Sequence, residues 1–170
     1  MKKLNFILVT FIVLLFSITI SKSSEKIVII DFEYIINNSE RGKLIFKDLN
    51  NKRDENIKKL KLDEKILKDE EKDIKLKKEI ISREELNNKL ISLNEKIKKF
   101  KKKKKVMENE LNQIKNKKMN NFINEINSVL ESYMKDKSLD IMLNTNNILI
   151  GKKSINKTDD ILKLINEKIK

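Results

Sequence analysis

The sequence of 170 residues contains no cysteine, histidine, proline or tryptophan, and it has two glycines. Without cysteine and histidine, the chain lacks disulfides, a thiol nucleophile, the ligands of the usual zinc sites and the most frequent general base. Because proline is absent and glycine scarce, the turns of an ordinary β-sandwich are not expected. These absences predict a helical protein that is not an enzyme and has no cofactor or metal ion.

Charged residues dominate what is present. The chain has 39 Lys+Arg against 26 Asp+Glu, a formal net charge of +13, and 5% aromatic residues. A composition of this kind is typical of long helices and coiled coils.

The first 23 residues differ from the rest of the chain. Lys2 and Lys3 precede an almost wholly apolar stretch, 4–20, and Ser21 and Ser23 stand where a signal peptidase requires small residues. We therefore predict a signal peptide, 1–23, and export to the periplasm if the host has two membranes. The alternative is an uncleaved anchor, although 17 helical residues span about 25 Å and a hydrocarbon core is about 30 Å thick.

The middle of the sequence predicts two long helices. The first begins after Ser39, a good N-cap residue, and runs to about residue 80. Ser82 and Glu85 fit a capping box, which marks the start of a second helix. A coiled-coil seam with 4-3-4-3 spacing follows at Leu86, Leu90, Leu93, Ile97 and Phe100. The two helices are expected to form an antiparallel hairpin that reverses near Ser82.

Short strands are predicted on both sides of this hairpin. Residues 26–31 (KIVIID) read as a strand buried on both faces, and 139–143 and 148–150 as a β-hairpin. Thr158 is expected to cap a last helix. Three short strands do not form a stable sheet alone, so their edges are expected to pair with identical chains.

In this layout the chain resembles the Skp/OmpH-like periplasmic chaperone family. The similarity rests on the strand after the signal peptide, on FEYIINNSERGK, on the Lys/Glu-rich hairpin, and on the segment from LDIML to the C-terminus. The matching positions are Asp31, Ile35, Ser39, Gly42, Lys43, Asp140, Asn144, Asp160 and Ile161.

The resemblance implies a homotrimer and an α+β fold. A small β-barrel body would be formed by strands shared across the trimer, with one long antiparallel coiled-coil arm per chain. The corresponding division is 24–42 with 119–170 for the body and 43–118 for the arm. The implied function is ATP-independent holding of unfolded outer membrane proteins.

Two groups of arm residues are candidates for binding. Because one partner helix cannot cover both flanks of a helix, some aliphatic residues are expected to remain exposed and to contact clients: Ile57, Ile66, Leu76, Ile80, Ile81 and Ile91. The densest basic run is a candidate surface for acidic clients, lipopolysaccharide or anionic lipid headgroups: Lys98, Lys99, Lys101, Lys102, Lys103 and Lys105. A simple solvated helix face is the competing interpretation of this run.

Nucleic acid is not an expected partner, because no aromatic residues interleave the lysines and the signal peptide removes the chain from DNA. The main alternative to a chaperone is a structural or tethering coiled-coil protein of the envelope, held on the membrane by an uncleaved N-terminal helix.

Overall fold

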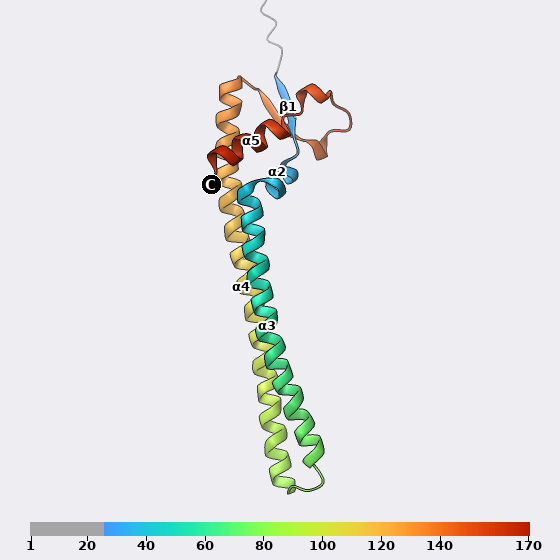
Figure 1. The fold of residues 1–170 in the computed structure, drawn as a ribbon. Helices are drawn as coiled ribbons and strands as arrows, with labels where there is room; N and C mark the ends of the chain where they lie inside the picture. Colours follow the sequence, from blue (N-terminus) through green and yellow to red (C-terminus); the bar gives the residue numbers. More distant parts are fainter. Residues whose placement is uncertain (1–25) are drawn as a thin grey trace, which may run out of the picture.

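Two long antiparallel helices dominate the molecule and project from a small cluster of strands and short helices (Figure 1). The computed structural model describes residues 26–170, so the predicted signal peptide, 1–23, lies outside the described residues. In chain order the elements are β1 Ile27–Ile30, α2 Phe32–Asn38, α3 Glu40–Lys77, α4 Arg83–Lys137, β2 Ile141–Asn144, the 3-10 turns η1 Thr145–Asn147 and η2 Lys153–Ile155, and α5 Thr158–Lys168.

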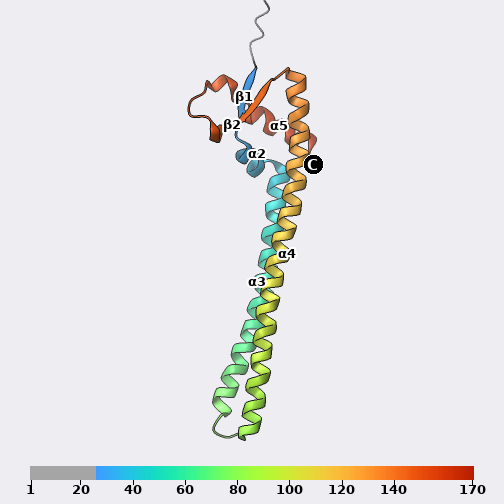
Figure 2. The ribbon, with the colours of Figure 1, turned by 180° about the vertical axis from the view of Figure 1, so that it is seen from behind.

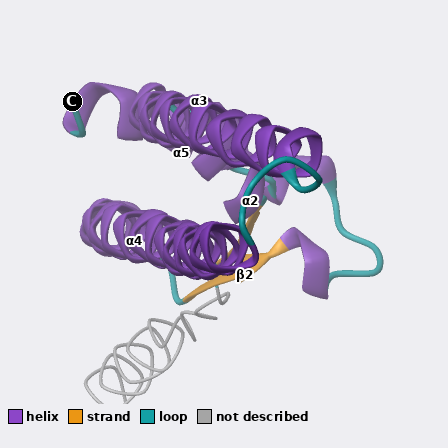
Figure 3. Ribbon diagram, turned by 90° about the horizontal axis from the view of Figure 1, so that it is seen from below, coloured by secondary structure: helices purple, strands orange, loops and turns teal. Residues whose placement is uncertain are grey.

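The predicted helical hairpin is confirmed. The first helix ends at Lys77 and the second begins at Arg83, so the chain reverses around Ser82. The Ser82 hydroxyl accepts a hydrogen bond from the Glu85 backbone N–H at 3.1 Å, which satisfies one of the donors left open at the start of α4. Viewed along the arm, α3 and α4 lie side by side (Figure 3).

The apolar core lies at the end of the molecule away from this reversal. Phe122, Ile126 and Val129 of α4 are buried, as the wider apolar stripe of the sequence predicts. They pack in one cluster with residues from β1, α2, the start of α3, and α5 with its C-cap. The other buried members of this cluster are Ile30, Ile35, Ile45, Ile161, Ile165 and Ile169. Helix α5 lies between the strands and the upper part of α4 (Figures 1 and 2).

The strands pair in parallel, and the predicted β-hairpin at 139–150 is wrong. β1 and β2 are in register from Ile27 opposite Ile141 to Ile30 opposite Asn144, and the whole helical hairpin forms the crossover between them. After β2 the Asn144 side chain accepts a hydrogen bond from the Asn146 N–H, which turns the chain into η1. Residues 148–150 are therefore loop, and Leu149 and Ile150 are 97% and 89% exposed.

Side chains join the two ends of the described chain. The Asp140 carboxylate accepts from the Lys26 N–H at 2.7 Å, and Asn166 accepts from the Glu40 N–H at 2.9 Å. Thr158, predicted as an N-cap, is instead the first residue of α5. Its hydroxyl accepts from the Asp31 N–H at 2.9 Å and thereby joins α5 to the residue between β1 and α2.

Candidate functional site

A series of ion pairs joins the two helices of the long arm. Three lysines of α4 contact three acids of α3 at 2.6–2.7 Å: Lys96 with Glu70, Lys103 with Asp63, and Lys118 with Asp48. From one pair to the next, the two helices advance by equal numbers of residues in opposite directions, seven and then fifteen. We call these three pairs the inter-helix ladder, and its equal steps show one constant antiparallel register.

The apolar seam of the arm is thin. Ile74 and Leu93 are buried toward the reversal, and Ile45 and Phe122 are buried at the base. Between these two buried pairs, the one buried arm residue among those that the structure describes is polar, Asn56, which is 8% exposed. A buried asparagine in a coiled-coil seam costs stability but favours one register over others.

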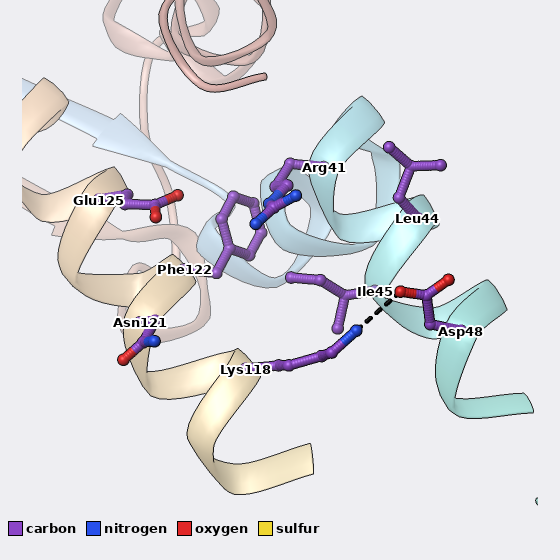
Figure 4. Close-up of a pocket in the computed structure, with 8 residues that line it drawn as sticks. All are labelled: Arg41, Leu44, Ile45, Asp48, Lys118, Asn121, Phe122 and Glu125. Carbon is purple, nitrogen blue, oxygen red and sulfur yellow. Dashed lines mark hydrogen bonds and ion pairs between the residues drawn. The ribbon is translucent and has the colours of Figure 1, made fainter. Parts of the chain in front are cut away.

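The last ladder pair closes a small cavity at the base of the arm. Figure 4 shows the Lys118 side chain extending from α4 to Asp48 on α3, beside Ile45 and Phe122. The hydrogen bond and the positive charge of Lys118 lower the pKa of Asp48 below its ordinary value, so this carboxylate stays ionised. With a volume of about 110 Å³, the cavity is well below the usual range for small-molecule sites, about 300–1,000 Å³.

Three glutamates of α3 have pKa values that are shifted in the direction opposite to that of a general acid. Glu55, Glu64 and Glu71 have lowered pKa values, because lysines four residues further along α3 donate hydrogen bonds to them. A general acid needs a raised carboxyl pKa, and these shifts go the other way. Within residues 26–170, no group of three or more His, Cys, Asp or Glu side chains is arranged to hold a metal ion.

The aliphatic candidates lie on the part of the arm between residues 57 and 91, toward the reversal. Five of the six are 42–80% exposed and Ile81 is half-buried: Ile57, Ile66 and Leu76 on α3, Ile80 and Ile81 in the reversal, and Ile91 on α4. The sequence did not indicate the other exposed aliphatic side chains on the arm, namely Leu44, Leu62, Leu90, Val106 and Ile114. Leu90 belongs to the predicted seam but is 43% exposed, because a heptad pattern does not show which row of residues faces the partner helix. Exposure makes contact with a client possible, and such contact stays a prediction.

The basic run also lies on the surface of α4. All six of its candidate lysines are exposed, and Lys103 is bound to Asp63 in the inter-helix ladder. In the described part of the chain, the other five, Lys98, Lys99, Lys101, Lys102 and Lys105, have no acidic group within 4.0 Å. The structure therefore separates one structural lysine from five whose charge is available to a partner.

The described helices include none that is both long and apolar enough to cross a membrane.

A small strand-and-helix body that carries one long helical hairpin defines the class of fold. The model of the family described as outer membrane protein (OmpH-like) matches residues 26–165, and the chain belongs to this family. A crystal structure of a protein from Caulobacter crescentus CB15, described as an outer membrane chaperone (OmpH-like), has the same fold, with a TM-score of 0.80. That protein shares 16% sequence identity, over 86% of this chain and 87% of its own. No curated protein sequence gives a match.

Proposed function

We propose that this protein is an ATP-independent periplasmic chaperone that holds unfolded outer membrane β-barrel proteins and prevents their aggregation, without catalysis. The observation that carries the proposal is the arm itself. Exposed aliphatic side chains lie on the arm together with lysines that have no acidic group within 4.0 Å among the described residues. The apolar core that stabilises the fold lies at the other end of the molecule. Many weak contacts of this kind bind a client and still allow its release.

The proposal assigns a separate role to each segment of the chain. Residues 24–42 and 119–170 form the body, 43–118 form the arm, and 1–23 form a signal peptide that is removed on export. Membership in the OmpH-like family supports this assignment, as does the fold shared with the Caulobacter protein.

We further propose that the protein is a homotrimer whose strands close into a barrel. The two-stranded sheet supports this, because two strands rarely form an independently stable sheet. In addition, Ile141 and Leu143 of β2 are 41% and 36% exposed, and a neighbouring chain would bury them. Light scattering of the mature protein is expected to give a trimer mass, and a folded monomer at micromolar concentration would contradict the barrel.

The function is tested with a shortened arm. Asp63 and Lys103 are bonded across the hairpin, so 64–102 can be replaced by a short turn without moving the ends. We expect this variant to keep its oligomeric mass but to lose most of its suppression of turbidity when an unfolded β-barrel protein is diluted from urea. Full protection by the shortened protein would refute the holding role of the arm.

Charge gives a second test of the same function. The predicted mature chain has a net charge of +10, with 36 basic and 26 acidic residues once Lys2, Lys3 and Lys22 are removed. Capture of an acidic client is expected to slow with added salt, since charges are screened over about 10 Å at 0.1 M. Binding to lipopolysaccharide or anionic headgroups would show the same dependence in a vesicle assay. The tethering alternative requires residues 1–23 to remain attached, which mass spectrometry of the mature N-terminus decides.

A further inference from the structure

Between two pairs of the inter-helix ladder, the arm has a groove. It lies between the Glu70–Lys96 pair and the Asp63–Lys103 pair, and its apolar lining is Ile66 and Leu67 of α3 and Phe100 of α4. Its volume is about 250 Å³. That is below the usual range for small-molecule sites, about 300–1,000 Å³, and suits one or two side chains of a polypeptide.

Two of the three lysines that line this groove are paired with acids, and the third is not. Lys96 and Lys103 are neutralised by their ladder partners at 2.7 and 2.6 Å. Lys99 also lines the groove, and no acidic group of the described residues lies within 4.0 Å of it. An occupant therefore meets an apolar floor with one uncompensated cation at its edge.

The exposure of Ile66 points to an occupant as well. This side chain is 63% exposed although it adjoins the half-buried Leu67 and Phe100. Covering a large aliphatic side chain is worth about 25 cal/mol per Å² of apolar surface removed from water. A chain segment laid across Ile66 would gain this energy, whereas folding of the arm alone does not.

We propose that this groove is a docking slot for client segments in which an aromatic or aliphatic side chain is followed closely by a carboxylate. The apolar side chain packs on Phe100, Leu67 and Ile66, and the carboxylate faces the Lys99 ammonium. The ladder pairs act as end walls that fix the slot's length. This inference rests on the proposed chaperone function and names one substrate feature that the arm recognises.

The test uses two fluorescein-labelled ten-residue peptides that differ in charge. One contains Leu-Tyr flanked by aspartates, and the other has lysines in place of the aspartates. Fluorescence anisotropy with the full-length mature protein measures both dissociation constants at low and moderate salt. We expect the acidic peptide to bind at least tenfold more tightly than the basic one, and equal affinities would overturn the charge rule.

Matched variants locate the binding. Ile66→Ser and Lys99→Gln are expected to weaken binding of the acidic peptide three- to tenfold. Ile150→Ser and Lys152→Gln remove comparable exposed groups from a loop of the body, away from the arm, and should change it less than twofold. Because Ile66 and Lys99 are exposed, these changes leave the arm folded, which circular dichroism verifies. If all four variants bind alike, the slot is not the docking site.

Two further outcomes distinguish failure of the docking slot from failure of the proposed chaperone function. If Ile66→Ser still suppresses client aggregation but no variant affects peptide binding, the chaperone function stands and the slot is refuted. If the unmodified protein fails to suppress aggregation, the proposed function fails even where the peptide binds. A third outcome would point to a lipid site. If the protein binds anionic phospholipid vesicles, loses this binding in the Lys99→Gln and Ile66→Ser variants, and does not bind the peptide, the proposal is overturned.

Discussion

Replacing Gly42 by alanine is expected to destabilise the protein, against the usual preference of helices. Gly42 is the third residue of α3, and in a helix interior a change from glycine to alanine normally stabilises by about 1 kcal/mol. Here an added β-carbon would overlap the Ile36 carbonyl oxygen and lie 2.8 Å from Ser39 Oγ. The carbonyl belongs to the backbone and cannot rotate aside, so the junction between α2 and α3 has to shift.

This shift would disrupt a closely bonded junction. Ser39 is fully buried, and its hydroxyl accepts from the Gly42 N–H and donates to the Ile36 carbonyl, both at 3.2 Å. Overpacking costs about 1–3 kcal/mol, and a weakened buried hydrogen bond adds about 1–3 kcal/mol. After subtracting the helical gain of about 1 kcal/mol, we expect a net loss of about 1–5 kcal/mol.

The measurement is urea unfolding followed by far-ultraviolet circular dichroism at one fixed protein concentration, since assembly makes stability depend on concentration. Gly151→Ala is the matched control. A β-carbon there meets its nearest neighbour, Ile29 Cδ1, at 3.5 Å, which is ordinary contact. A Gly42→Ala protein as stable as the unmodified one, or more stable, would show that the close approach to Ile36 does not constrain this position.

Three other perturbations test where stability lies. Ile126→Ala, in the body core, is expected to cost about 2–5 kcal/mol in urea unfolding, whereas Ile80→Ala, 80% exposed at the reversal, should change it by less than about 0.5 kcal/mol. Lys103→Glu should destabilise the arm modestly and the exchanged pair Lys103→Glu with Asp63→Lys should restore it, and a pair no better than the single change would refute a register role for the ladder. The lowered pKa values of Glu55, Glu64 and Glu71 stabilise the folded arm fully above the ordinary glutamate pKa of 4.5, and this contribution is lost as pH falls through the folded values. Helicity that stays constant from pH 6 to pH 3 at low salt would contradict that account.

The elements that follow from local sequence were predictable. The hydroxyl of Ser82 and the row from Phe122 to Val129 carry the information for the reversal and for the buried stripe within a few residues of chain. The buried strand β1 is predictable for the same reason, because its apolar run is continuous.

The direction of strand pairing was not predictable in this way. Two apolar runs separated by NTNN match a β-hairpin, yet β2 pairs with β1, more than a hundred residues earlier in the chain. The choice depends on the position to which the helical crossover returns β2, and no local pattern encodes that position. Thr158 shows the same limit, since its hydroxyl contacts Asp31 rather than its own helix.

The residue types of the candidate binding surface were predictable, but which of its lysines form ion pairs was not. Sequence places six lysines in one run, but it does not show that Lys103 is bound to Asp63 while Lys99 is not. The register of the two helices makes this distinction, and the register depends on contacts between residues 26 to 70 positions apart.

The thin seam and the exposed aliphatic residues have one physical cause. An apolar stripe wide enough to bury Ile57, Ile66 and Leu76 would need a second partner helix, and each arm has one. The inter-helix ladder and the buried Asn56 are features that favour one register, and the remaining aliphatic side chains lie outside the contact between the two helices. Lysines between them keep each exposed patch small, which limits self-association of the arms. A helical hairpin built in this way leaves aliphatic side chains exposed to solvent, as the proposed holding of clients requires.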